Sequence, residues 1–482
     1  MKVDRWACLI VLLAVLALAA IPLTGCGDDD DDDDDDDSDD HYIGDDDDAT
    51  PDDDDDDTVD DDTSDDDTGD DDTADDDTTE DTLEITPWAE MIPAGTDHNF
   101  GATGTIDGEP VDDGFTWSID DEDIATVDAN GTVTGIADGM AVLTAAIGEA
   151  SAEAYALVGP DIYVLDNQLG LLMGIDRGAG TAIADLLATE ASIAVVLNDI
   201  VLDPNTGLLA MVDSGDSGAG ITGDEKLIVV DMLDDLALTN ITLNQDSPWS
   251  VAMLDGVAFI TGNLDDTLAK IDLTAKDPTP TYFDLDDGCV PTDIIGIDGY
   301  VYITCSGFDS GTFTYEPGKV LKIDAATGTE AAELILPQVN PNNFALAPDG
   351  SLYVVCTGNY VDELGVVAQI DLSDFSVADS FALGSSPGPI GINDDGIGFV
   401  GEGMAGSMYV FDSADNSVIH GDADPIAIPS GLWVQAVGVH NDTGDAYVCD
   451  QFNGKVYVID GDDYSLGETP YELTNPGGVT FW

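Results

Sequence analysis

The chain has 482 residues, of which 103 are Asp or Glu and only 9 are Lys or Arg, giving a formal net charge of −94 at pH 7. A chain of this length predicts two or more domains. So large an excess of negative charge argues against nucleic-acid binding, which needs basic residues to neutralise phosphates, and against attachment to anionic lipid through charge.

Residues 1–25 have the pattern of a secretion signal, with two basic residues followed by an apolar run over residues 7–21. That run is shorter than the roughly 20 residues of a membrane-spanning helix, which is the alternative interpretation. It leads into a Leu-Thr-Gly-Cys sequence that resembles the lipobox of bacterial lipoproteins. The resemblance implies cleavage before Cys26 and acylation of that cysteine. Because Gly27 follows in place of Asp, the family's sorting rule favours the outer membrane, with the protein facing the periplasm or the cell surface.

Residues 26–82 are a low-complexity acidic segment, with 35 Asp, one Glu and no Lys or Arg between residues 28 and 82. Like charges repel and almost nothing apolar is available to bury, so we expect a disordered tether. Fully extended it would reach roughly 180 Å. Loose Ca²⁺ binding is the alternative to a plain spacer. The remaining 83–482 still carries 66 acidic against 7 basic residues, an excess that a salt-loving host would also explain.

Residues 83–158 predict a small β-sandwich. Apolar and polar residues alternate over residues 115–119 and 125–127, and Asn130-Gly131 is a tight-turn signal. Trp117-Ser118, the run Ile-Ala-Thr-Val-Asp at residues 124–128 and the run Gly-Thr-Val-Thr-Gly at residues 131–135 resemble the group 2 bacterial Ig-like domain. This resemblance implies a stalk, adhesin module or spacer. A resemblance to this fold does not by itself imply any chemical activity.

Residues 159–482 contain an internal repeat of four apolar bursts, the third of which ends in Asp. This Asp recurs with a mean spacing of about 47 residues, at Asp176, Asp231, Asp272, Asp324, Asp371, Asp412 and Asp460. Four strands per repeat without helical periodicity predict a β-propeller, for which we count seven blades, with six or eight as the alternatives. Blade 1 lacks a first strand, whereas residues 476–482 match the start of a blade. We therefore expect the C-terminal strand to pair with the strand of Tyr163 and close the ring.

The Tyr-Val bursts, the Ile-Asp endings and the Asn before the third strand (Asn263, Asn359 and Asn453) resemble the YVTN family of seven-bladed propellers, which is related to the NHL type. Related propellers include lactonases and lyases that use His, Arg or a metal cage. No matching set of residues maps onto this chain. The fold class predicted is therefore all-β, with an Ig-like sandwich followed by a seven-bladed propeller and preceded by a disordered acidic tether.

The loops after the second strands gather on the face where propeller ligands usually enter. They combine acids with aromatics, which suits a cation, sugar or peptide ligand. The candidate ligand-binding residues are Tyr315, Glu316, Asp309, Asp362, Glu363, Glu402, Asp450, Trp249 and Trp433. Solvated loops on an acidic protein are the alternative, and a Ca²⁺ site made of these carboxylates stays open although no EF-hand spacing occurs.

No enzyme motif lies in its proper context. The Gly-x-Ser-x-Gly string at residues 384–388 and the Gly-x-Gly-x-x-Gly strings at residues 218–223 and 401–406 stand between predicted strands, without the helix that each needs. No catalytic residue or required cofactor is predicted. Cys289 and Cys305 lie at the same end of one predicted hairpin, so they are the expected disulfide in an oxidising compartment.

The favoured interpretation is a lipid-anchored envelope or surface protein that binds a glycan, peptide or cell-surface protein through its propeller, without catalysis. The alternative is a propeller-type lactonase, lyase or other hydrolase with a metal at the channel mouth. The oligomeric state and the identity of any bound metal are left open by the sequence.

Overall fold

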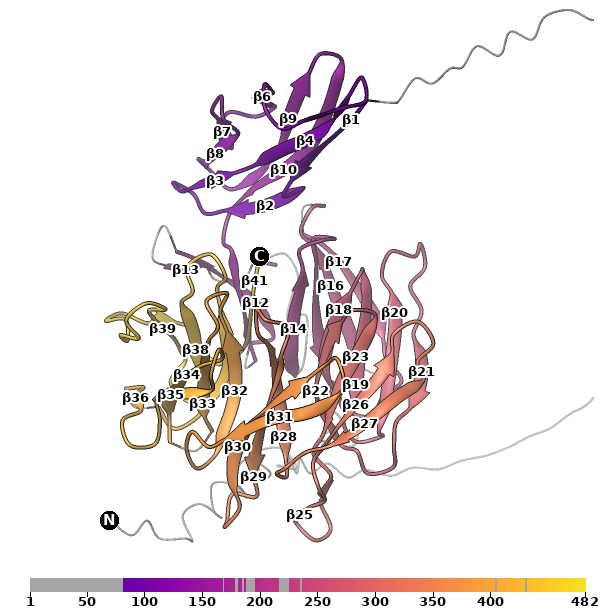
Figure 1. Ribbon diagram of the computed structural model, residues 1–482, viewed down its shortest axis with the longest axis vertical. Helices are drawn as coiled ribbons and strands as arrows, with labels where there is room; N and C mark the ends of the chain where they lie inside the picture. Colours follow the sequence, from indigo (N-terminus) through magenta and orange to yellow (C-terminus); the bar gives the residue numbers. More distant parts are fainter. Residues whose placement is uncertain are drawn as a thin grey trace, which may run out of the picture. The chain divides into compact units, whose positions relative to one another are not determined.

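The structure is a computed structural model that describes residues 81–482 except 168, 178–180, 184–185, 188–195, 216–224, 235, 404 and 430 (Figure 1). Residues 1–80, which include the expected signal segment, Cys26 and most of the acidic segment, lie outside the described residues. The described elements are β-strands, apart from one short 3₁₀ helix at Gln451–Asn453. In this part of the chain no helix is long and apolar enough to cross a membrane.

The first domain is a β-sandwich built from ten strands. They are β1 (Thr82–Thr86), β2 (Ala89–Ile92), β3 (Asp97–Asn99), β4 (Gly101–Ile106), β5 (Glu109–Val111), β6 (Thr116–Ile119), β7 (Ala125–Val127), β8 (Thr132–Gly135), β9 (Gly139–Ile147) and β10 (Ala150–Val158). The sheets have the orders β2-β10-β9-β6, β1-β4-β5 and β3-β8-β7. Along β9 the buried residues alternate with more exposed ones, as expected when one face of a strand packs on a core.

The Asn-Gly turn predicted in the sandwich lies between β7 and β8, and it needs glycine. Gly131 has a φ of +85°, and a Cβ there would lie 2.6 Å from the carbonyl oxygen of Phe100 and 2.8 Å from the ring of Trp117. The carboxylate of Asp128 accepts hydrogen bonds from the backbone N–H groups of Asn130 (2.8 Å) and Thr132 (3.0 Å). The turn thus fixes the pairing of β7 with β8 and the position of Trp117 at the edge of the core.

The second domain contains seven sheets of at least four strands, each a blade of the propeller (Figure 1). Named from the innermost strand outward, blade 1 consists of β41 (Pro476–Phe481), β11 (Ile162–Asp166), β12 (Leu171–Asp176) and β13 (Thr181–Ile183); blade 2 of β14 (Leu197–Asp203), β15 (Leu208–Asp213), β16 (Lys226–Asp231) and β17 (Ala237–Thr242); and blade 3 of β18 (Pro248–Leu254), β19 (Val257–Gly262), β20 (Thr267–Asp272) and β21 (Thr281–Asp284). Blade 4 consists of β22 (Pro291–Ile297), β23 (Tyr300–Cys305), β26 (Lys319–Asp324) and β27 (Glu330–Ile335), and blade 5 of β28 (Pro341–Leu346), β29 (Leu352–Gly358), β30 (Leu364–Asp371) and β31 (Ser376–Phe381). Blade 6 consists of β32 (Pro387–Ile392), β33 (Ile397–Glu402), β34 (Ser407–Asp412) and β35 (Ser417–His420), with β36 (Ile426–Ala427) beside β34, and blade 7 of β37 (Val434–Val439), β38 (Ala446–Asp450), β39 (Lys455–Ile459) and β40 (Tyr471–Glu472). A separate hairpin of β24 (Phe308–Asp309) and β25 (Thr314–Tyr315) projects from the fourth blade. The all-β fold class and the seven-bladed propeller predicted from the sequence are confirmed.

The ring is closed by strands from the two ends of the propeller domain. β41 pairs antiparallel with β11, with Thr480 opposite Tyr163 and Phe481 opposite Ile162. The backbone N–H of Trp482 donates to the carbonyl of Asp161 at 2.9 Å. Neighbouring innermost strands contact each other all the way round, from β41 through β14, β18, β22, β28, β32 and β37 back to β41. No sheet edge therefore remains open at the junction between the first and seventh blades.

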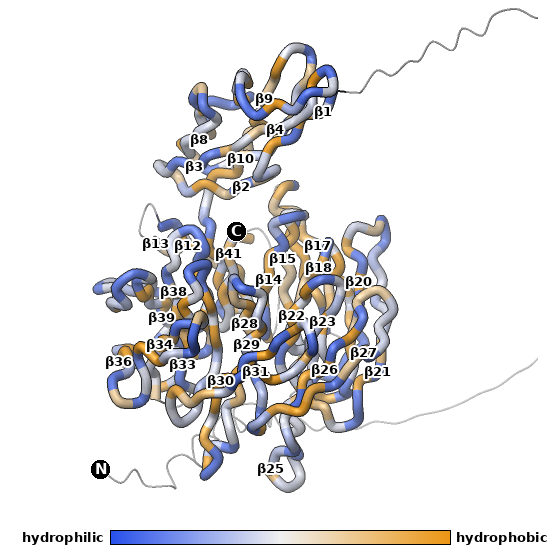
Figure 2. The backbone as a smooth tube through the Cα atoms, viewed as in Figure 1, coloured by the Kyte–Doolittle hydropathy of each residue, from blue (hydrophilic) through white to orange (hydrophobic). Residues whose placement is uncertain are grey.

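The core lies between the blades, where the middle strands are covered on both faces. Every residue of β29 is buried, and the same holds for β11 and β38. This burial explains why these strands are continuous apolar runs in the sequence instead of alternating ones. Figure 2 shows the hydrophobic residues concentrated in the strands of the blades, with hydrophilic residues in many of the connections.

The propeller has two different faces, because successive antiparallel strands reverse direction. The connections between first and second strands and between third and fourth strands lie on one face, which we call the turn face. The connections between second and third strands, and those from one blade to the next, lie on the other, the loop face. β11 is the second strand of its blade, so its start at Ile162, where the chain arrives from the sandwich, lies on the turn face.

The structure joins Cys289 and Cys305 in a disulfide, which links the segment before β22 to the end of β23 on the loop face. Cys356 and Cys449 are free and fully buried in β29 and β38. Burial raises the pKa of both thiols to about 12. These two side chains therefore behave as small apolar core residues rather than as nucleophiles or metal ligands.

Candidate functional site

The hairpin β24–β25 carries Asp309 and Tyr315, two of the residues that the sequence singles out, and it extends from the loop face (Figure 1). A third, Glu316, follows β25 directly, and its backbone N–H donates to the carbonyl of Gly307 at 2.9 Å. The ring of Tyr315 lies 5.1 Å from that of Phe308 in a tilted arrangement, and Phe313 meets the same Phe308 ring edge-on at 6.1 Å. Asp309 is used within the hairpin, because its carboxylate accepts from Gly311 N–H (2.8 Å) and Thr312 Oγ1–H (2.7 Å). These hydrogen bonds hold the pKa of Asp309 below its usual value. The aromatic side chains are therefore the parts of the hairpin best placed to contact a ligand.

Asp362 and Glu363 lie in the exposed loop between β29 and β30. The loop is organised by Asn359, whose Oδ1 accepts the backbone N–H groups of Val361, Asp362 and Glu363 at 2.9–3.0 Å. Asn359 Nδ2 in turn donates to Asp362 Oδ1 at 3.0 Å. This geometry turns Val361 outward, with 80% of its surface exposed. Both acids stay at the surface of the loop face.

Glu402 and Asp450, which the sequence predicts as candidate ligand-binding residues in shorter loops of this face, are both buried. Glu402 is 6% exposed and accepts a 2.7 Å hydrogen bond from Ser385 Oγ. Asp450 is fully buried and accepts from the backbone N–H (3.3 Å) and side-chain Nδ2 (2.8 Å) of Asn453, which holds the 3₁₀ helix after β38. Both carboxylates stabilise loops from inside, and neither is available to a ligand at the surface.

The loop face instead collects exposed apolar side chains that the sequence analysis misses, except for Trp249. The described part of the chain has fourteen large apolar residues with exposed side chains, and nine of them lie in loops of this face or among the first residues of strands that start there. These nine, which we call the apolar rim, are Leu169, Val196, Trp249, Leu264, Phe313, Val361, Leu364, Leu432 and Phe452. Trp249 follows the proline that begins β18 and is 41% exposed, whereas Trp433, which precedes β37, is not among the exposed side chains.

Two aspartates from innermost strands share a serine near the propeller axis. Ser250 Oγ lies 2.6 Å from Asp199 Oδ2 and 3.0 Å from Asp293 Oδ1. Asp199 also accepts from the N–H of Val251 in the next blade (2.9 Å), and Asp293 from the N–H of Phe344 in the blade after its own (2.7 Å). Burial and the neighbouring charge of Asp199 raise the pKa of Asp293 to about 7, and burial raises that of Asp199. The pair therefore links adjacent blades at an electrostatic cost.

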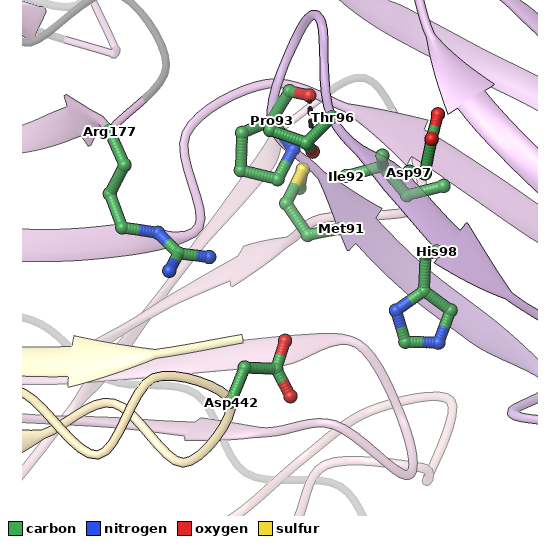
Figure 3. Close-up of a pocket in the computed structure, with 8 residues that line it drawn as sticks. All are labelled: Met91, Ile92, Pro93, Thr96, Asp97, His98, Arg177 and Asp442. Atoms are coloured by element: carbon green, nitrogen blue, oxygen red, sulfur yellow. Dashed lines mark hydrogen bonds between the residues drawn. The ribbon is translucent and has the colours of Figure 1, made fainter.

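A cavity of about 300 Å³ lies where the sandwich meets the turn face, with side chains from both domains around it (Figure 3). Its lining residues are Met91, Ile92, Pro93, Thr96, Asp97 and His98 of the sandwich, and Arg177 and Asp442 of the propeller. The same two domains share a buried apolar cluster that contains Ala89, Met91 and Leu157 together with Leu202 and Met232. The cavity is therefore bounded by packed side chains on the sandwich side.

The propeller side of this cavity carries a buried charge network. Arg177 donates to Asp161 Oδ2, and His440 Nε2 lies 3.0 Å from the same oxygen. Burial acts to raise the pKa of Asp161, but the hydrogen bonds from His440 and Arg177 outweigh it and hold the pKa below its usual value. Asp161 is 2% exposed and His440 3%. Arg177 is thereby fixed with its guanidinium directed toward the cavity (Figure 3).

Beside the cavity, Glu90 on β2 lies close to His98 on β3 and to Asp442 in the turn between β37 and β38. Burial raises the pKa of Glu90 to about 7, with further contributions from the charges of Asp442 and Asp161. Burial also lowers the pKa of His98, partly offset by Asp442. The sequence analysis misses this group because its members come from segments about 350 residues apart; no spacing signal links them.

Residues 84–158 match the family model of the bacterial Ig-like domain (group 2). Among solved structures, the chain is similar to the periplasmic gluconolactonase of Pseudomonas aeruginosa, with 12% sequence identity and a TM-score of 0.53 over 67% of this chain and 98% of that one. It is also similar to a functionally unknown protein from Desulfotomaculum acetoxidans (12% identity, TM-score 0.50, 67% and 99% covered) and to virginiamycin B lyase from Staphylococcus aureus (15% identity, TM-score 0.46, 58% and 87% covered).

No curated protein sequence matches the chain. Identities this low carry the fold and not the activity of the similar proteins. The chain thus contains a group 2 bacterial Ig-like domain, followed by a β-propeller.

Proposed function

We propose that this protein is a lipid-anchored envelope protein of the outer membrane whose YVTN-type propeller binds a ligand through its loop face. In this proposal Cys26 carries the lipid, the Asp-rich segment is a spacer, and the Ig-like domain holds the propeller on its turn face. The loop face is then left free for a glycan, a peptide or a cell-surface protein.

The observation that carries the proposal is the apolar rim. Its nine side chains come from six of the seven blades, and all belong to one face of a protein whose surface is otherwise strongly acidic. Scattered exposed apolar residues need no explanation, but their concentration on one face indicates an interaction site. Apolar contact area supplies most of the favourable free energy of association, and aromatic residues supply the largest share at binding sites.

The backbone of the β24–β25 hairpin supports the same conclusion. Phe313 has a φ of +56° and is 60% exposed at the tip of the hairpin. A bulky residue rarely adopts this left-handed conformation, which costs about 1–2 kcal/mol and suits Gly or Asn far better. Keeping Phe at a strained and exposed position is typical of a residue retained for contact with a partner.

The charges on the loop face indicate which ligands it would accept. Three lysines begin third strands there, and each is paired with acids: Lys226 with Asp213 (3.8 Å), Lys319 with Asp286 (2.5 Å) and Glu333 (3.1 Å), and Lys455 with Glu472 (3.2 Å). With these cations neutralised and acids in the majority, an anionic ligand meets repulsion. A neutral or cationic ligand with an apolar part fits the face best.

The proposal is tested with the lipid-free protein on glycan and cationic-peptide arrays and on intact bacterial cells. The loop-face variant combines Trp249→Ala, Phe313→Ala and Phe452→Ala, which are 41–60% exposed. The control combines Ile136→Ala, Leu346→Ala and Val418→Ala, which lie elsewhere and are 40–49% exposed. We expect the loop-face variant to lose at least tenfold in affinity and the control to bind normally. Equal binding by both variants would refute the site, and turnover of gluconolactone by the wild type would favour the lactonase alternative instead.

A further inference from the structure

Three side chains with metal-binding atoms converge beside the cavity at the turn face. Glu90 and Asp442 each offer a carboxylate oxygen and His98 a ring nitrogen, and these three atoms lie within 4.8 Å of one another. His98 Nδ1 is 3.8 Å from Glu90 Oε1, with 27% and 18% of the two side chains exposed. Figure 3 shows His98 and Asp442 facing the same cavity from opposite domains.

The spacing of the three atoms fits a first-row metal ion. Atoms no more than 4.8 Å apart can all lie within about 2.8 Å of one central point, and the 3.8 Å pair can lie closer still. Zn²⁺ bonds to His nitrogen and carboxylate oxygen are about 2.0–2.2 Å long, so adjustments of well under 1 Å per side chain complete the coordination.

The local charges also favour a cation at this point. Arg177 lines the same cavity and interacts electrostatically with Asp442, but its ion pair is with Asp161. Among the described residues, no Lys or Arg lies within ion-pair distance of Glu90 or Asp442. Two carboxylates held close together repel, and a bound divalent ion converts this repulsion into attraction.

We propose that Glu90, His98 and Asp442 bind one divalent transition-metal ion, with Zn²⁺ the best fit, at the junction of the Ig-like domain and the propeller. The mixed nitrogen and oxygen ligands suit Zn²⁺ and its neighbours rather than Ca²⁺, which takes six to eight oxygens. Three protein ligands leave a fourth position for water or another oxygen ligand. His98 and Asp442 line the 300 Å³ cavity together with Arg177, which is fixed by Asp161 and suits an anionic oxygen.

The ion would also connect the two domains, since Glu90 and His98 belong to the sandwich and Asp442 to the propeller. Apolar packing between Met91, Leu157 and Met232 already joins them. A metal ion adds a directional link that depends on metal concentration and is lost with chelators. The site lies on the face opposite the apolar rim, so this inference is independent of the proposed ligand-binding function.

The test uses the full chain, stripped with EDTA and returned to a buffer with several millimolar Mg²⁺, which occupies weak sites in the Asp-rich segment. Co²⁺ is then titrated while its visible absorption is followed, because ligation by His and carboxylates at a low-coordinate site gives intense bands. Zn²⁺ is added last as a competitor. We expect one Co²⁺ per chain and loss of the bands on adding Zn²⁺.

The variants are His98→Gln and Asp442→Asn, and the matched control is His420→Gln. His420 also lies next to an acid, Asp424 at 3.7 Å, and is about as exposed as His98, but the described residues supply no third metal-binding side chain there. We expect both site variants to bind Co²⁺ at least tenfold more weakly and the control to bind as the wild type does. Absence of a stoichiometric site in the wild type, or equal losses in His98→Gln and His420→Gln, would overturn the proposal.

Near-ultraviolet circular dichroism of the metal-free variants separates loss of the site from loss of the fold. Should His98→Gln fail to fold, Asp442→Asn decides the question, because Asp442 lies in an exposed turn. Unchanged Co²⁺ binding by a folded Asp442→Asn variant would likewise contradict the assignment.

Discussion

Asp293 gives the propeller a pH-dependent stability whose sign follows from its position. Burial and the charge of Asp199 raise its pKa to about 7, from the 3.8 of an unperturbed aspartate. The folded chain therefore keeps a proton on this carboxyl at pH values where the unfolded chain has released it. Between these pKa values the folded state binds more protons, so the free energy of unfolding falls as pH rises.

The magnitude can be worked from the same pKa difference. A tenfold change in proton affinity corresponds to about 1.4 kcal/mol, so raising the pH from 5 to 8 should lower the free energy of unfolding by roughly 2–3 kcal/mol through Asp293. This figure is an upper limit because the residue is partly accessible to water. Asp199 has a raised pKa as well and acts in the same direction.

Urea denaturation of the wild type and of Asp293→Asn at pH 5 and pH 8 measures this effect. The amide leaves one backbone donor, such as Phe344 N–H, without an acceptor, which costs about 1–3 kcal/mol at both pH values. The informative quantity is the difference in the free energy of unfolding between pH 5 and pH 8, which we expect to be smaller in Asp293→Asn than in the wild type. The control Asp394→Asn removes one exposed charge and should keep the wild-type difference. A wild type more stable at pH 8, or an unchanged difference in Asp293→Asn, would refute the reasoning.

Three further predictions concern the anchor, the ring closure and the hairpin. Cys26→Ser should move the protein from the membrane fraction to the soluble fraction of its host, whereas continued membrane association would contradict lipidation. Deleting residues 476–482 should lower the melting temperature sharply, because the deletion exposes the edge of β11. Adding the missing segment as a peptide should partly restore the melting temperature. An unchanged melting temperature after the deletion counts against closure by this strand. Phe313→Asn should leave the free energy of unfolding within about 1 kcal/mol of wild type, because relief of the left-handed strain offsets the lost contact with Phe308. Binding to the arrays should fall in the same variant. A stable Phe313→Asn variant with full binding would exclude Phe313 from the site.

The architecture can be predicted from the sequence because its causes repeat along the chain. Middle strands buried on both faces, such as β29, must be apolar runs, and turns such as the one at Gly131 must contain glycine. These constraints act locally and recur in each blade. The pattern therefore indicates strands, blades and the domain order without knowledge of the contacts between them.

The details of the loop face cannot be predicted in the same way. Glu402 and Asp450 have the composition of exposed loop acids, and only their contacts with Ser385 and Asn453 reveal that they are internal hydrogen-bond acceptors. Likewise, an apolar loop residue such as Leu264 does not show from sequence whether it packs inward or stays exposed. Its 65% exposure depends on the three-dimensional arrangement of the blades.

The group formed by Glu90, His98 and Asp442 at the domain junction is even harder to predict from sequence patterns. Glu90 and His98 are close in the chain, but Asp442 reaches them only because the propeller closes and brings the seventh blade beside the sandwich. Short sequence motifs identify metal ligands that come from one turn or hairpin. Ligands contributed by two domains have no fixed spacing in the sequence and form no such motif.

Closure of the ring by β41 has a consequence for the order of events during biosynthesis. β41 is synthesised after all other strands, yet it is the innermost strand of the blade that is made first. Blades 2 to 7 can complete their sheets as the chain emerges, but the first blade has to wait for residues made more than 300 positions later. A chain delivered across a membrane from its N-terminus would therefore stay an open arc throughout transit and become a ring only in the compartment where it works.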